Sequence, residues 1–185
     1  MKMFPRAILK STAVALLSLS ALNVMLALTV EKVSLQRMTE ESRLVVHGKI
    51  LSSYSQWEGN NIFTYTTVRV IEPIKGETSE TVIVKQVGGT VGDTGSEIAG
   101  TPKLLRNEEV VLFLTEWKGS YWIHSIVLGM FTVEEEAGVR VAYNNLNNVG
   151  LIDPVTREEI VDPNQKNTHF PLQDFLQQVR SLAVK

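Results

Sequence analysis

Cysteine is absent from all 185 residues of the chain. Without thiols the chain can form no disulfide framework, and it cannot carry the lipid that anchors bacterial lipoproteins through a cysteine. Histidine is also scarce, and His47, His124 and His169 lie far apart, with neither H-E-x-x-H nor H-x-H spacing. Because a zinc site needs such clustered ligands, we expect no metal and no cofactor.

Positive charge is scarce after residue 30. Lys2, Arg6 and Lys10 account for three of the 18 basic residues, so the rest of the chain carries 15 against 20 acidic residues, a net charge of −5. No basic cluster alternates with aromatic residues there, and an acidic surface gains nothing from the release of phosphate counterions. We therefore expect no nucleic-acid partner.

The first 29 residues have the features of an export signal. Three basic residues precede an uncharged stretch, residues 11–30, that consists mostly of Ala, Leu and Val. This arrangement is typical of a signal peptide, and it predicts a secreted or periplasmic protein after cleavage. An uncleaved signal anchor is the alternative, because about twenty apolar residues can span a bilayer. Membrane contact is expected only through this segment, and the pattern fixes neither the cleavage position nor the oligomeric state.

Short segments rich in β-branched and aromatic residues follow one another from residue 44 to residue 143. Residues 58–61 form a turn signal that joins the first two segments, 44–57 and 62–71, into a predicted hairpin. Gly48 within the first segment predicts a bend. Further strands are expected at residues 81–87, 110–114, 121–128, 130–134 and 139–143. With no strand–helix alternation, the pattern predicts a mainly β fold, a small antiparallel barrel.

Helices are predicted on both sides of these strands. Residues 34–43 indicate a short helix capped by Ser34, and Pro171 begins an amphipathic helix that we expect to dock on the barrel. Residues 144–170 shift to Asn, Asp, Pro and Glu, which predicts an extended arm on the barrel surface. The expected parts are the signal (1–29), the barrel domain (30–143), and the arm with the C-terminal helix (144–185).

Several motifs between residues 43 and 114 resemble a known family. They are an R-L-V-V-H-G-K-I strand, Trp57 before a turn, Y-T-T-V-R-V closing on I-K-G, V-x-V-x-Q-x-G-G, G-T-P and E-E-V-V-L-F-L. The chain resembles exported bacterial proteins of unassigned function, which are similar to the oligonucleotide/oligosaccharide-binding (OB) barrel of the netrin and metalloproteinase-inhibitor type. The resemblance covers residues 33–143 and implies an OB-like barrel rather than an activity. Inhibitors of that superfamily chelate zinc through an amino-terminal cysteine, so an inhibitor-like role here would need another contact.

Residues 87–102 form the longest expected loop and contain five of the twelve glycines. Within it, Asp93 begins the D-T-G-S motif of aspartic proteases, in which two carboxylates share a proton. A single copy of the motif requires a homodimer, and Gly88, Gly89 and Gly92 replace the apolar strand that precedes it in those enzymes. We therefore interpret Asp93 as a turn residue and keep the hydrolase as an alternative. His47 is interpreted as a half-exposed strand histidine, because no acid or nucleophile is paired with it.

Aromatic residues are the remaining candidates for a binding surface: Trp57, Trp117, Trp122, Tyr54, Phe63, Tyr65 and Tyr121. Rings at the rim of a small barrel can stack on sugars or peptides. The simpler interpretation is that Phe63 or Tyr65, and one of Tyr121 and Trp122, fill the core.

The sequence thus predicts an exported, non-enzymatic module that binds a protein or glycan partner of the cell envelope. The predicted binding residues are Trp57, Gly88, Gly89, Asp93 and Trp122, and no catalytic residue is expected. The alternatives are a protease-associated, inhibitor-like accessory protein and an aspartic-type hydrolase that uses Asp93.

Overall fold

The computed structural model describes residues 28–146, 149–161 and 168–184. The predicted signal lies outside this part of the chain, except for Leu28 and Thr29, which belong to strand β1 (Leu28–Glu31). Within the described ranges, neither helix has the length and apolar character needed to cross a bilayer.

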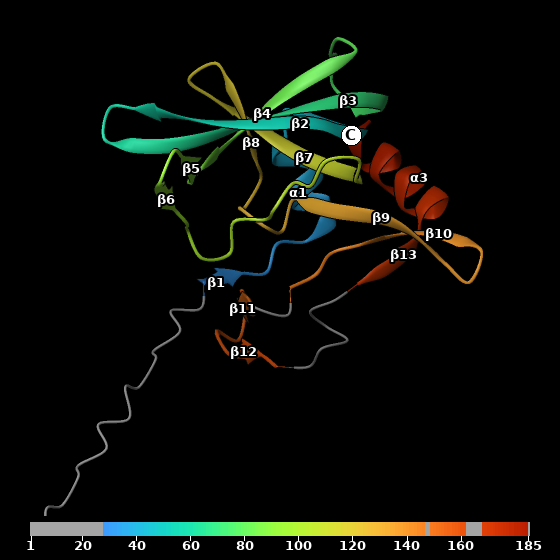
Figure 1. Ribbon diagram of the computed structural model, residues 1–185. Helices are drawn as coiled ribbons and strands as arrows, with labels where there is room; N and C mark the ends of the chain where they lie inside the picture. Colours follow the sequence, from blue (N-terminus) through green and yellow to red (C-terminus); the bar gives the residue numbers. More distant parts are fainter. Residues whose placement is uncertain (1–27, 147–148, 162–167, 185) are drawn as a thin grey trace, which may run out of the picture.

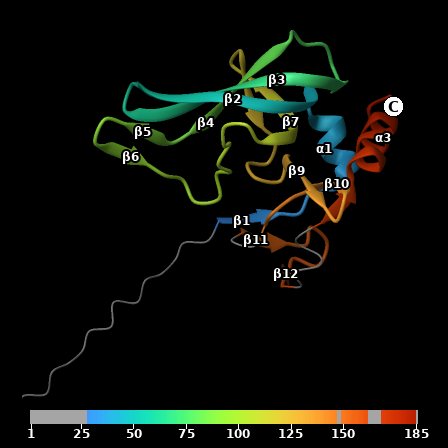
Figure 2. The ribbon, with the colours of Figure 1, turned by 45° about the vertical axis from the view of Figure 1, so that its right-hand side comes forward.

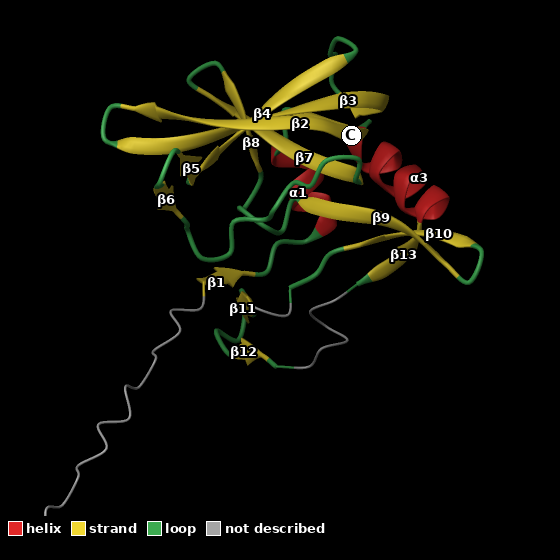
Figure 3. Cartoon of the chain, viewed as in Figure 1, coloured by secondary structure: helices red, strands yellow, loops and turns green. Residues whose placement is uncertain are grey.

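The fold is mainly β and is built on a closed ring of strands (Figures 1 and 3). The ring consists of β2 (Leu44–Glu58), β3 (Asn61–Lys75), β4 (Thr81–Val87), β8 (Ser120–Ile123) and β7 (Glu109–Trp117), in that order. β7 pairs back with β2, which closes the ring. All neighbours are antiparallel except β4 and β8, which meet in parallel where Val84 pairs with Tyr121. The predicted hairpin and the mainly β class are therefore confirmed.

The other elements attach to this ring. Three strands extend the sheet from β7: β9 (Met130–Glu136), β10 (Val139–Tyr143) and β13 (His169–Pro171). A separate sheet joins β1 to β11 (Val149–Ile152) and β12 (Glu159–Ile160), and α1 (Leu35–Glu41) and α3 (Leu172–Ala183) lie on one side of the ring (Figure 2). The described part of the predicted arm therefore supplies strands to both sheets.

Strand β7 divides the core into two clusters. Val110, Leu112 and Leu114 face the inside of the ring, where aliphatic side chains from the other ring strands surround them. Val111 and Phe113 face the opposite side, where the buried face of α3 covers them. All five residues are fully buried, so the strand predicted at residues 110–114 is covered on both sides.

Strand β2 bends at Gly48, as predicted. The register with β3 shifts between His47 and Gly48, and a Cβ atom at Gly48 would lie 2.7 Å from the Arg69 carbonyl oxygen and from Val68 Cγ1. Because any larger side chain would push β3 away, glycine lets the two strands cross closely at the bend.

Two sequence predictions of local structure were wrong. The strand predicted over 121–128 ends at Ile123, and residues 124–129 turn the chain into β9, with the Gly129 amide donating to the His124 carbonyl at 3.0 Å. Ser125 and Ile126 take left-handed backbone conformations there, which a strand does not allow. The second error concerns the glycine-rich segment, which contains a short hairpin of β5 (Gly89–Val91) and β6 (Thr94–Ser96) instead of only irregular chain.

Candidate functional site

One end of the ring carries a group of aromatic side chains on its outer face. Strand pairing sets Tyr54 of β2 opposite Tyr65 of β3, and Tyr65 opposite Lys85 of β4. Since Ile62 and Thr66 on β3 point inward and are buried, alternation turns Phe63 and Tyr65 outward. We call Tyr54, Phe63, Tyr65, Trp117 and Trp122 the aromatic surface.

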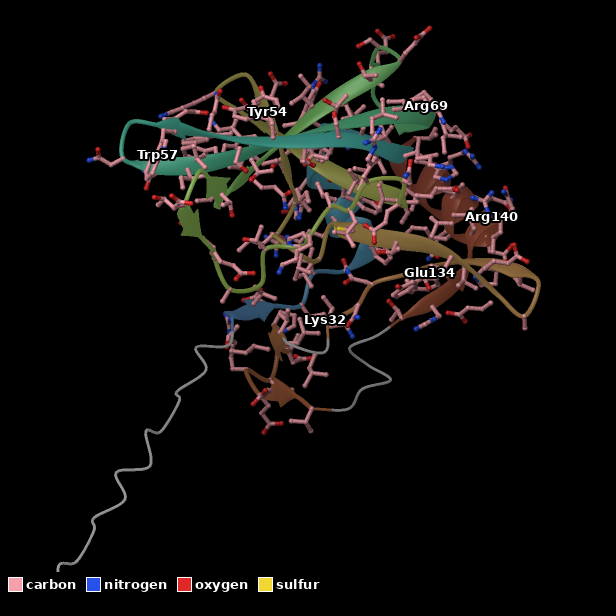
Figure 4. All side chains as sticks on the ribbon, viewed as in Figure 1. Lys32, Tyr54, Trp57, Arg69, Glu134 and Arg140 are labelled. Carbon is pink, nitrogen blue, oxygen red and sulfur yellow. The ribbon has the colours of Figure 1, made fainter. Side chains whose placement is uncertain are left out.

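The rings of the aromatic surface form two contacting groups, one of Tyr54 and Tyr65 and one of Phe63, Trp122 and Trp117. Tyr54 stacks on Tyr65 with centroids 5.3 Å apart, while Trp122 meets Phe63 edge-on at 6.2 Å and Trp117 at 5.9 Å. Tyr54 is 54% exposed and Trp117 is 59% exposed, so both ends of the row are open to solvent. Figure 4 shows Tyr54 on the hairpin of β2 and β3. Phe63 and Tyr65 are only half-buried, so the expectation that one of them fills the core was wrong. Tyr121 packs against the core cluster inside the ring, which agrees with the expectation for one of Tyr121 and Trp122.

A lysine lies at the centre of this surface. The Lys85 ammonium is 4.2 Å from the centroid of Phe63 and 5.6 Å from that of Trp122, within the range of cation–π attraction. It also donates to Glu58 at 2.6 Å, and the Tyr65 hydroxyl donates to the same carboxylate. Hydrogen bonds from Lys85 and Tyr65 hold the pKa of the Glu58 carboxyl below its ordinary value. The ion pair therefore joins β2 to β4 and holds Lys85 next to rings of β3 and β8.

Removing this ammonium should be visible in the titration of Glu58. In a Lys85→Met variant we expect the pKa of Glu58 to rise toward that of a free carboxyl, because its main hydrogen-bond donor is lost. A lowered carboxyl pKa stabilises the fold above the ordinary pKa, and this contribution disappears as the pH falls through the lowered value. Carboxyl-carbon NMR between pH 2 and 7 measures the shift. Lys118→Met is the control, because Lys118 lies over Trp117 but donates no hydrogen bond to Glu58; an unchanged Glu58 pKa in Lys85→Met would contradict the role of the ion pair.

The inner face of the same hairpin borders a groove of about 590 Å³. Ser53, Thr64 and Thr66 line its floor and belong to a ladder of hydroxyl groups, in which Ser53 pairs with Thr66 at 2.8 Å and Thr64 with Ser55 at 2.9 Å. Thr64 donates its proton to the Gly88 carbonyl at 2.7 Å, so Ser55 must be the donor to Thr64. The glycine-rich segment forms the opposite wall.

Three of the five predicted site residues lie at these two places, and Trp57 and Asp93 lie at neither. Trp122 belongs to the aromatic surface, whereas Gly88 and Gly89 border the groove. Trp57 is near the hairpin tip and, by alternation, on the face opposite Tyr54. Asp93 is exposed in the two-residue turn between β5 and β6, where a protease carboxylate would not be placed. This position agrees with its interpretation as a turn residue and gives no support to a hydrolase.

The histidines have acidic partners that the sequence did not reveal. His47 is only 4% exposed, and its Nε2 lies 2.5 Å from Glu109 Oε1, which also accepts from Arg140. The interpretation of His47 as half-exposed was therefore wrong, because β9, β10 and α3 cover this side of the ring. His124 is buried as well and contacts Glu41 at 3.0 Å. In the described ranges these side chains do not assemble into a group of three or more metal ligands.

Sequence reasoning identified the aromatic candidates but missed Lys85 and Glu58. Glu58 is at the end of β2 and Lys85 is an isolated charge within β4, and only the register of β4 against β3 places Lys85 beside Tyr65. A search with family models, with curated proteins and with solved structures found no match to this chain.

Proposed function

We propose that this chain is an exported, non-enzymatic binding module that holds a glycan of the cell envelope on the aromatic surface. The observation that carries the proposal is the row of partly exposed rings contributed by β2, β3, β7 and β8. Sugar rings present flat C–H faces that pack on aromatic side chains, and their hydroxyl groups can bond to nearby charged groups. Glu58 supplies such a group between the rings.

The strand order supports the finer fold proposal, an OB-like barrel. An OB barrel has five strands, and it binds oligonucleotides and oligosaccharides on the face of its second and third strands and on the loops beside them. In this chain the corresponding face is that of β3 and β4, which holds Phe63, Tyr65 and Lys85. The turn between β7 and β8 holds Lys118, next to Trp117. This correspondence is an analogy at the level of the fold, and the exposed rings carry the proposal.

Net charge favours a glycan over a nucleic acid at the same face. Residues 31–185 carry a net charge of −5, and Lys85, the cation at the centre of the surface, is already paired with Glu58. A nucleic acid would need several unpaired cations to replace its counterions. A neutral sugar needs only ring faces and hydrogen-bonding groups.

Truncating an exposed ring should weaken glycan binding. We expect Trp117→Ala and Tyr54→Ala each to raise the Kd for a bound oligosaccharide about tenfold, which corresponds to about 1.4 kcal/mol. Binding would be measured by isothermal titration after screening immobilised envelope oligosaccharides. Val139→Ala is a matched control, because Val139 is 51% exposed but lies on β10, remote from the surface in strand order. If the protein captures envelope proteins but binds no oligosaccharide, the partner is a protein and not a glycan. If all three variants lose the same oligosaccharide affinity, the aromatic surface is not the binding site.

A further inference from the structure

Along residues 52–57, one edge of β2 has no hydrogen-bonded strand in the described part of the chain, although β5 lies against the Ser55 side chain on the inner face. β2 pairs with β7 from Leu44 to Lys49, and Ile50 exchanges hydrogen bonds with Asn107 and Glu108. Within the described residues, the backbone of residues 52–57 pairs with β3 alone. Five of these six residues are exposed. A row of backbone N–H and C=O groups therefore faces solvent along one side of a sheet.

This edge lacks the devices that usually protect an open strand. Exposed edges are commonly guarded by lysine, by proline or by an inward-pointing charge. Residues 52–57 read S-S-Y-S-Q-W and contain no charge and no proline. A bulge at Ile50 and Ser52 precedes the segment, but the pairing with β3 from Ser52 to Glu58 is regular. The segment is thus suited to accept another strand.

The chain leaves space beside this edge. The hydrogen bond from the Asn107 amide to the Ile50 carbonyl is 2.9 Å long, and Asn107 takes a left-handed conformation with φ of 71°. At this point the segment that leads into β7 separates from β2 and becomes the wall of the groove. Ser53 lies on the floor of that groove, and Ile98, Leu104 and Leu105 lie on the wall.

We propose that the edge of β2 from Ser52 to Trp57 is a docking site at which an extended, uncharged peptide segment of a partner protein adds a strand. The added strand would run antiparallel to β2, in line with β7. Main-chain hydrogen bonds supply the affinity in this mode of recognition, and alternate side chains supply the specificity. This site does not depend on glycan binding at the aromatic surface.

The surroundings of the edge define the chemistry of the peptide. Side chains on the groove side meet the aliphatic wall, where Ile98 is 43% and Leu105 is 56% exposed. Peptide side chains on the opposite, outer face would lie next to Tyr54 and Gln56. The charged groups at the groove rim, Glu97 and Lys103, pair with each other at 3.1 Å. The groove therefore offers no unpaired charge to a charged segment, and it favours aliphatic and hydroxyl side chains in alternation with aromatic ones.

A peptide taken from this chain provides the probe. Residues 62–68, Ile-Phe-Thr-Tyr-Thr-Thr-Val, already pair with β2 on its other edge and are uncharged. Their first five side chains alternate aliphatic or hydroxyl with aromatic. We expect the acetylated and amidated peptide to bind the protein with a micromolar Kd. Alternate backbone amides of residues 52–57 should become at least tenfold more protected from hydrogen exchange.

Two N-methylated versions of the peptide identify strand pairing specifically. One carries methyl groups on the amides of its second, fourth and sixth residues, and the other on the third, fifth and seventh. Only one set of amides can face β2, so one version should lose binding at least 100-fold while the other keeps it. Leu105→Ala should weaken the unmodified peptide severalfold, and Val139→Ala should have no effect.

Three results would overturn the proposal. Equal affinity of both methylated peptides would show that binding does not depend on backbone hydrogen bonds to β2. Protection outside residues 52–57 would place the peptide elsewhere. Concentration-dependent protection of these amides without peptide, together with a dimer by sedimentation, would make a second copy of the chain the occupant.

Discussion

Replacing Phe175 by alanine should lower the free energy of unfolding by about 3–5 kcal/mol, because a fully buried aromatic side chain leaves a cavity that the core cannot fill. Phe175 lies on α3 and is 1% exposed. Its ring is 4.6 Å from that of Phe131 and 5.2 Å from that of Phe170, measured between centroids, and it meets Phe113 edge-on at 6.3 Å. The loss is a large part of the 5–15 kcal/mol typical of a domain.

Urea unfolding followed by tryptophan fluorescence measures this loss, with Gln177→Ala as the control. Gln177 is exposed two residues further along the same helix, so its truncation should change stability by no more than about 0.5 kcal/mol. Comparing the two variants tests whether the packing of α3 on the ring contributes to the stability of the fold. A loss below about 1 kcal/mol for Phe175→Ala would show that the helix is only loosely attached to the ring and is free to serve a partner.

Much of the secondary structure could be predicted from local pattern. Residues 81–87 and 139–143 are strands with the predicted bounds, because runs of β-branched residues end there at glycine or asparagine. The 3.6-residue spacing of Leu172, Phe175, Leu176, Val179 and Leu182 predicts the buried face of α3. The first four are buried and Leu182 is half-buried. Such features depend on neighbours within a few residues.

Features that depend on distant pairing could not be predicted. The parallel contact of β4 with β8 closes the ring through Val84 and Tyr121, which are 37 positions apart and show no local signal. The contact of His47 with Glu109 spans 62 positions, and only the register of β2 against β7 brings them together. The strand pair of β1 and β11 joins Leu28 to Val149, which are 121 positions apart, in the same way.

The candidate surfaces combine features that follow from local sequence with features that depend on distant strand pairing. Tyr54, Phe63 and Tyr65 were recognised as candidates by residue type, but their outward direction follows from which β3 residues are buried. The open edge of β2 could not be predicted from the sequence, because an unpaired strand has the same sequence pattern as a paired one. Its lack of charge becomes meaningful only when the partner strands are known.

Alanine in place of Gly89 should disrupt the glycine-rich wall of the groove and cost about 2–5 kcal/mol in the free energy of unfolding, the sum of backbone strain and overpacking. Gly89 has φ of 132°, which L residues rarely adopt, and its added Cβ atom would overlap the hydroxyl oxygens of Ser55 and Thr64. Those hydroxyls are bonded to each other, and Thr64 also holds the Gly88 carbonyl. They cannot move apart without breaking these bonds.

The control lies on the paired strand of the same hairpin. Gly95 is directly opposite Thr90, and a Cβ atom there would meet only Thr90 Oγ1 at 3.8 Å, an ordinary contact. Gly95→Ala should therefore change stability by no more than about 0.5 kcal/mol. Urea unfolding compares the two variants, and hydrogen exchange of residues 88–96 shows whether the hairpin detaches from β2 and β3 instead of destabilising the whole fold. Equal stability and equal exchange in both variants would mean that Gly89 is not needed for the close approach of β5 to the hydroxyl ladder. Its place near the groove would then have to be explained by a ligand.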